Sequence, residues 1–146
     1  MLTNQENLML ENATSFDELK DVALSVLKRM EGPIFQVCGP MTTGGLGSLE
    51  LNLEVFRKTI DTLKSQGKHV FDQLPFEDHM MRIKESGKSN LLEAFYLPIF
   101  ESGMIKKLYF IYGWWNSRGS LWEHAEAKRL GIPRRYLPFN FHIEPS

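Results

Sequence analysis

The order of apolar and polar positions along the chain predicts helices that alternate with short strands. Apolar residues recur at a spacing of three and four in several stretches, and three of these stretches follow a serine at the cap position. Short apolar runs between them are typical of buried strands. The predicted helices follow Ser15, Ser48 and Ser120, with two more between residues 73 and 102 around a break at Gly87-Lys88-Ser89. The predicted strands are 34–38, 68–72, 108–112 and 134–137.

This alternation predicts an α/β fold, a Rossmann-like parallel sheet of four to five strands with helices on both faces. Residues 1–13 are polar and are expected to be flexible, and residues 14–146 are expected to form a single domain. Parallel sheets of this kind bind ligands beyond the carboxyl ends of their strands. The loops 39–48 and 113–120 are therefore expected to face each other across a crevice.

Composition and charge limit the partners and cofactors that the sequence gives reason to expect. With 42% apolar residues, 24% charged residues and a net charge of −1, the chain gives no reason to expect a nucleic acid polymer or a membrane as partner. Cys38 has no second cysteine to pair with, and the start of the chain lacks the features of a signal peptide, so we expect a cytoplasmic protein. The four histidines are scattered without ligand spacing, and we expect neither a metal nor a cofactor.

The loop GPMTTGGLGS, residues 39–48, has four glycines among ten residues and leads from a predicted strand into a predicted helix. Such a loop suits phosphate binding by backbone N–H groups at a helix N-terminus. It matches neither the dinucleotide fingerprint nor the Walker loop. A plain tight connection is the alternative interpretation.

The segment after the third predicted strand places hydrogen-bond donors at the start of a helix, from Ser117, Arg118, Gly119 and Ser120. If Ser120 caps this helix, Glu123 lies in its first turn and shares the inward face with Ala127. An inward carboxylate beside these donors suggests a role in catalysis. An acidic residue in a first turn also gains ~0.3–1 kcal/mol from the helix dipole without any function.

Several short blocks of the chain share the pattern of one known group of proteins. The blocks are Gly39-Pro40-Met41, Asn52 with Phe56, Gly113-Trp114, and Ser117-x-Gly119-Ser120-x-x-Glu123-x-x-x-Ala127 followed by Gly131-Ile132-Pro133. In these residues the sequence resembles the nucleoside 2-deoxyribosyltransferase-like superfamily, above all its phage and bacterial branch. The resemblance covers residues 34–137.

The resemblance implies a flavodoxin-like sheet and cleavage of the N-glycosidic bond of a small-molecule nucleoside or nucleotide. It makes Glu123 the nucleophile, places Ser117 at the 5′-phosphate and implies an acidic residue near the leaving base, for which Asp72 and Glu101 are candidates. It also implies a site that a neighbouring subunit can complete in a homo-oligomer. The residues expected to contact substrate or phosphate are Gly39, Pro40, Met41, Thr42, Gly44, Gly45, Gly113, Trp114, Ser117, Arg118, Gly119 and Ser120.

Other functions remain open at this stage. Lys106 stands where members of the superfamily often have an aspartate, which favours a nucleotide-binding sensor that does not cleave its ligand. A protein-interaction domain with Trp114 and Trp115 as its exposed anchors is a further alternative. Within the catalytic interpretation, attack by water makes a hydrolase and attack by a second base makes a transferase.

Overall fold

The computed structural model describes residues 2–41, 44–86 and 91–142. The chain divides into two compact units, which are described one at a time. We call Glu31–Phe71 with Ile105–Ser146 the sheet unit, and Met1–Met30 with Asp72–Met104 the helical unit. The single domain expected over 14–146 stays a prediction.

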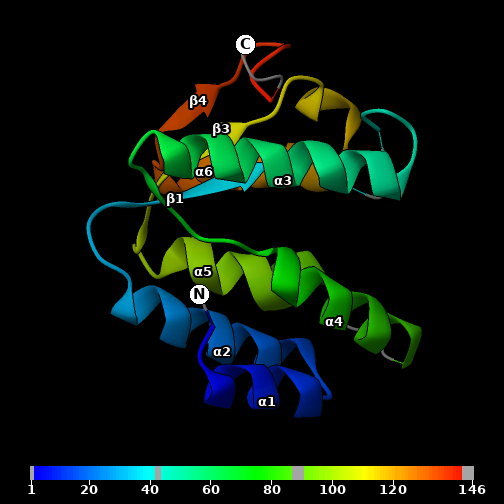
Figure 1. Cartoon of the computed structure of the whole chain (residues 1–146), viewed down its shortest axis with the longest axis vertical. Helices are drawn as coiled ribbons and strands as arrows, with labels where there is room; N and C mark the ends of the chain where they lie inside the picture. Colours follow the sequence, from blue (N-terminus) through cyan, green and yellow to red (C-terminus); the bar gives the residue numbers. More distant parts are fainter. Residues whose placement is uncertain (1, 42–43, 87–90, 143–146) are drawn as a thin grey trace. The chain divides into compact units, whose positions relative to one another are not determined.

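The sheet unit contains a four-stranded parallel sheet in the order β2-β1-β3-β4 (Figure 1). The strands are β1 (Ile34–Cys38), β2 (His69–Val70), β3 (Ile105–Phe110) and β4 (Arg134–Tyr136). This confirms the predicted α/β class and the parallel sheet. The order also matches the first four strands of the flavodoxin-like order 2-1-3-4-5.

Strand β3 begins three residues earlier than the apolar run at 108–112 predicted. The charged residues Lys106 and Lys107 interrupt the apolar pattern, yet both belong to the strand. The Lys107 ammonium lies over the rings of Phe35 and Tyr109, at 5.6 and 5.8 Å from their centroids. A lysine stem that covers aromatic rings while its charge stays near water is compatible with a strand.

Two longer helices accompany the sheet. Helix α3 (Leu49–Ser65) begins as predicted, because the Ser48 hydroxyl accepts a hydrogen bond from the Leu51 amide at 3.1 Å. Helix α6 (Arg118–Leu130) follows β3 and the short 3₁₀ turn η2 (Trp114–Asn116). The β1-to-β2 and β3-to-β4 connections run in opposite directions from the centre of the sheet. Because such crossovers are right-handed, α3 and α6 cover opposite faces.

The helical unit consists of α1 (Asn4–Asn12), α2 (Phe16–Arg29), α4 (Leu74–Ser86), η1 (Leu92–Tyr96) and α5 (Leu97–Glu101). Residues 4–12 were expected to be flexible because they are polar, but they form α1. Thr3 and Glu6 make a capping box at its start, and Glu6 also pairs with Arg29 of α2 at 2.6 Å. These contacts compensate for the weak apolar pattern. The predicted break at Gly87-Lys88-Ser89 lies outside the described residues.

Within the described residues, none of the helices combines the length and the apolar character needed to cross a membrane.

Candidate functional site

The sheet unit has a topological switch point between β1 and β3. These two strands are neighbours, and Cys38 at the end of β1 is in register with Phe110 at the end of β3. The chain leaves β1 toward one edge of the sheet and leaves β3 toward the other. In open parallel sheets, ligands bind in the crevice that opens at such a point.

Glu123 lies at this edge of the sheet. Its side chain is 7% exposed, on the face of α6 that also buries Ser120 and Ala127. The Cys38 thiol, at the end of β1, lies against the Glu123 carboxylate. Burial raises the pKa of this thiol well above its usual range, and the negative charge of Glu123 and the hydrogen bond to it raise it further. Glu123 therefore faces inward, as its helical spacing with Ala127 predicted, and contacts the end of β1.

The start of α6 differs from the prediction. Ser117, and not Ser120, is the cap, and its hydroxyl accepts a hydrogen bond from the Ser120 amide at 3.3 Å. Arg118 and Gly119 thus form the first turn, although a glycine inside a helix costs roughly 1 kcal/mol relative to alanine and therefore argued for a loop. As a result Glu123 lies in the second turn. The favourable effect of the helix dipole is weaker there than in the first turn.

The loop after β1 is held by one buried side chain, Asn52 of α3. Its amide nitrogen donates to the carbonyl oxygens of Met41 at 2.8 Å and Gly44 at 3.2 Å, and its amide oxygen accepts from the Leu46 amide at 2.9 Å. A Cβ atom on Gly45 would overlap the Asn52 amide oxygen, which explains the glycine there. Thr42, a predicted substrate contact in this loop, lies outside the described residues.

The loops after β1 and β3, which were expected to face each other across a crevice, touch each other at one point. Gly44 has a φ of +70°, and a Cβ atom on it would overlap the backbone carbonyl of Asn116. Gly39 lies similarly close to the side chain of Ile111. In both places the absence of a side chain allows the two loops to approach.

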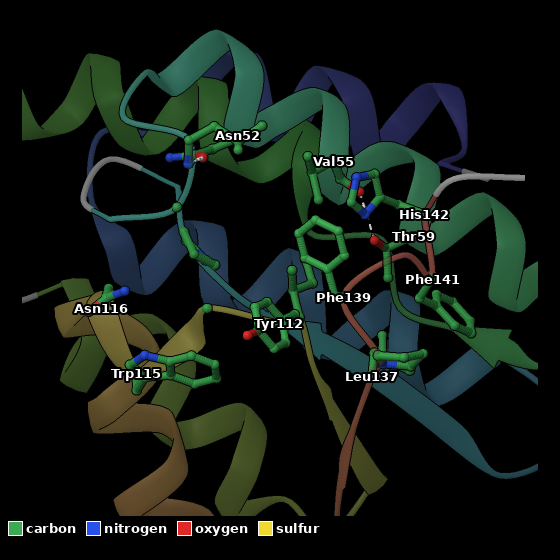
Figure 2. A pocket seen from close by; sticks show the side chains of 16 residues that line it. Asn52, Val55, Thr59, Tyr112, Trp115, Asn116, Leu137, Phe139, Phe141 and His142 are labelled. Atoms are coloured by element: carbon green, nitrogen blue, oxygen red, sulfur yellow. Dashed lines mark hydrogen bonds between the residues drawn. The ribbon is translucent and has the colours of Figure 1, made fainter.

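A cavity of about 240 Å³ opens at the same edge of the sheet (Figure 2). We call it the aromatic cavity. Its walls come from α3, from both loops and from the segment after β4, and they include the exposed side chains of Leu46, Tyr112, Trp115 and Phe139. Pro40, Gly45 and Gly113 of the predicted set also line it. Glu123, Ser117 and Ser120 are not among its described lining residues.

The two adjacent tryptophans have different environments. The Trp114 ring stacks on His124 at 4.4 Å between centroids and an interplanar angle of 17°, and it also packs against Tyr136. Burial lowers the pKa of His124, and the charges of Arg134 and Lys128 lower it further. Trp114, which was expected to contact substrate, is therefore engaged in this ring cluster, and it is Trp115 that lines the cavity.

The remaining predicted residues are distributed as follows. Arg118 is exposed at the first position of α6, and Gly119 beside it is half-buried. Asp72 and Glu101 both belong to the helical unit. Asp72 accepts a hydrogen bond from the Leu74 amide at 3.0 Å at the start of α4, and Glu101 is exposed at the end of α5. Their assignment as the second acid stays a prediction.

The sequence interpretation missed several residues of the site. Asn52 was noticed only as part of a pattern, and Cys38 only as part of a strand. Tyr112 was assigned to the end of the predicted strand 108–112, and Phe139 gave no signal because it follows the last strand. Ser120, by contrast, was among the predicted substrate contacts; it is fully buried, and its hydroxyl has no hydrogen-bond partner among the described residues.

No group of three histidine, cysteine, aspartate or glutamate side chains within the described ranges is arranged to hold a metal ion. In comparisons with protein-family models, with curated proteins and with solved structures, nothing matches this chain.

Proposed function

We propose that the protein cleaves the N-glycosidic bond of a nucleoside or nucleoside 5′-monophosphate, ribo or deoxy, with Glu123 as the nucleophile. The observation that carries this proposal is the place of Glu123. A carboxylate is buried on the inner face of α6, against the end of β1 and at the switch point of a parallel sheet. N-glycosidic bonds break through a cation-like sugar, which a carboxylate can trap or stabilise.

The chemistry follows from the position of this carboxylate. Glu123 attacks the anomeric carbon, and the base leaves with the electron pair of the C–N bond and takes up a proton. Water then adds its hydroxyl to the sugar carbon, releases its proton to solvent and frees the carboxylate, or a second base attacks and completes an exchange. The thiol of Cys38 lies against this carboxylate at the end of β1.

The start of α6 supports the binding of a 5′-phosphate. The backbone N–H groups of a first helical turn favour anions, and Arg118 adds a positive charge at its first position. Ser117 and Ser120 add hydroxyl groups on the buried side. A phosphate held there would orient the sugar relative to Glu123, and such positioning contributes to the rate.

The test is incubation of the purified protein with each nucleoside and 5′-monophosphate, with and without an acceptor base, followed by chromatography for released or exchanged base. Glu123→Gln keeps the size of the side chain and removes its charge, and we expect it to lower base release by roughly 10² or more. Glu126→Gln is the matched control, because Glu126 lies on the same helix and pairs with Arg129 at 2.6 Å.

Circular dichroism of both variants verifies that they fold. The proposal fails if no substrate releases or exchanges its base, or if Glu123→Gln is as active as the Glu126→Gln control.

One observation favours a second candidate, a nucleotide-binding module without turnover. The aromatic cavity does not include Glu123 among its described lining residues. Ligand binding can thus take place apart from the carboxylate. Nucleotide binding that is unchanged by Glu123→Gln, with no base released from any substrate, would favour this module over the glycosidase.

A further inference from the structure

Strand β4 forms one edge of the sheet, and within the described residues its outer side pairs with no other strand (Figure 1). The carbonyl of Pro133 and the amide of Leu137 both bond to β3 at 2.9 Å. Alternate residues of a strand direct their backbone groups to the same side. The N–H and C=O groups of Arg134 and Tyr136 therefore point away from β3, and no described group bonds to them.

The described residues after β4 turn toward the aromatic cavity and do not cover this edge. Leu137, Phe139 and Phe141 all line that cavity. In the flavodoxin-like order a fifth strand lies beside β4. Along the described chain the place of that strand is open, and the outward backbone groups of Arg134 and Tyr136 face it.

The composition of β4 limits which strand can pair with it. An open edge is a template for another strand, and proteins restrict such pairing with short edges and charged side chains. Strand β4 has three residues, and two of them are arginines. A second copy paired edge to edge would bring like charges together, which is unfavourable. The arginines thus oppose self-association and favour a strand of opposite charge.

Positive charge continues from this edge onto α6. The Tyr136 hydroxyl lies 2.6 Å from the Nε2 atom of His124, and Lys128 follows His124 by one helical turn. Burial lowers the pKa of His124, and the charges of Arg134 and Lys128 lower it further, so both cations lie near its ring. Neither of them, nor Arg135, forms an ion pair with a described residue. No described carboxylate therefore neutralises the edge.

The side chains of β4 alternate between the two faces of the sheet. Tyr136 contacts α6, so Tyr136 and Arg134 lie on the face that α6 covers, and Arg135 lies on the other face. A strand beside β4 with an acidic residue at every second position would place those residues next to Arg134 and Lys128. The Tyr136 ring, which is 53% exposed, gives an apolar side chain of the same strand a surface to pack on.

We propose that the outer edge of β4 binds an extended acidic segment of another protein, which adds a strand to the sheet. The backbone of Arg134 and Tyr136 supplies the hydrogen bonds, and the side chains of Arg134 and Lys128 supply the charge. This inference does not depend on the glycosidase, because the edge contains none of the residues assigned to that reaction.

The test is fluorescence anisotropy of a labelled peptide of about eight residues, in which glutamate and valine alternate, titrated with the full chain. We expect Arg134→Gln and Lys128→Gln each to weaken binding by about two- to fivefold, which is typical of the loss of one exposed ion pair. Arg57→Gln is the matched control, since Arg57 is exposed on α3 of the same unit, and it should bind as the wild type does.

Methylated peptides separate strand addition from attraction between charges alone. One peptide carries N-methyl groups on its glutamates and the other on its valines, so each has lost the amide donors of one side and kept its charge. With the glutamates on the face of α6, a strand parallel to β4 directs its valine amides to the edge, and an antiparallel strand directs its glutamate amides there. We expect one methylated peptide to bind about tenfold or more weakly and the other to bind like the unmodified peptide.

Several results would overturn the inference. These are no binding of the peptide, equal binding of the two methylated peptides, and equal binding by Arg134→Gln and Arg57→Gln. A thymine oligonucleotide of the same length that displaces the labelled peptide better than unlabelled peptide does would identify a nucleic acid as the ligand instead. A wild-type dimer that the peptide dissociates would show that a second copy covers the edge.

The two proposals fail separately. Peptide binding without base release from any nucleoside or nucleotide would support the edge of β4 and defeat the glycosidase. Base release that depends on Glu123, without peptide binding, would do the reverse.

Discussion

Replacing Asn52 tests whether one side chain holds the loop after β1 in place. Asn52 is 4% exposed on α3 and makes three hydrogen bonds to the backbone of this loop, at Met41, Gly44 and Leu46. Asn52→Ala removes all three bonds at once. Asn52→Asp keeps the acceptor for the Leu46 amide but places a carboxylate against two carbonyl oxygens. The two variants therefore separate the loss of bonds from repulsion.

The expected loss of unfolding free energy follows from the three hydrogen bonds of Asn52. A neutral hydrogen bond contributes about 0.5–1.5 kcal/mol net, so three bonds are worth at most about 4.5 kcal/mol. Water can satisfy part of the freed loop backbone, because Gly45, Leu46 and Gly47 are exposed. We therefore expect Asn52→Ala to lower the free energy of unfolding by about 2 kcal/mol. At neutral pH Asn52→Asp should lower the free energy of unfolding by at least as much as Asn52→Ala.

The assay is unfolding in urea followed by tryptophan fluorescence. All three tryptophans, at 114, 115 and 122, belong to the sheet unit, so their signal reports the unit that contains Asn52. Glu54→Ala is the control on the same helix, since Glu54 is exposed and forms only a surface pair with Lys58, for which less than about 0.5 kcal/mol is expected. A loss for Asn52→Ala no greater than that of the control would refute the argument.

Two further predictions concern backbone contact and pH. Gly44 and Gly47 both have positive φ, but of the two only Gly44 has a neighbour, the Asn116 carbonyl, where a Cβ atom would lie. Urea unfolding should therefore show that Gly44→Ala lowers the free energy of unfolding by about 1 kcal/mol or more beyond the loss for Gly47→Ala. The hydrogen bond from Arg29 holds the pKa of Glu6 at about 2, below its ordinary 4.5, so this pair stabilises the fold above about pH 4.5 and the contribution is lost as pH falls toward 2. Glu6→Gln should remove that part of the acid dependence of unfolding by circular dichroism, and an unchanged profile would contradict it.

The alternation of strands and helices was predictable because each element is encoded locally. An apolar run such as 34–38, followed by a glycine-rich loop and a capped helix at Ser48, specifies a strand, a crossover and a helix without knowledge of the rest of the chain. The same local signals failed where two of them competed. Ser117 and Ser120 both suit a cap, and only the backbone geometry after η2 determines that Ser117 is used.

The aromatic cavity was not predictable, because it depends on distance in space and not along the chain. Tyr112 follows β3, Leu46 follows β1 and Phe139 follows β4. Each of them alone is an ordinary apolar residue at the end of a predicted strand or in the segment that follows one. Only the strand order β2-β1-β3-β4, which places the ends of β1, β3 and β4 side by side, turns them into one surface.

The position of Glu123 bears on the alternative that the sequence left open. A glutamate in the first turn of a helix needs no function, because the dipole stabilises it while water still solvates it. Glu123 is instead in the second turn and 7% exposed, on the face of α6 that also buries Ser120 and Ala127. Burial of a carboxylate costs free energy that the end of the dipole offsets less well at this depth. The explanation from a first-turn carboxylate therefore does not apply to Glu123 where the structure places it, and the comparison of Glu123→Gln with Glu126→Gln distinguishes a catalytic carboxylate from a structural one.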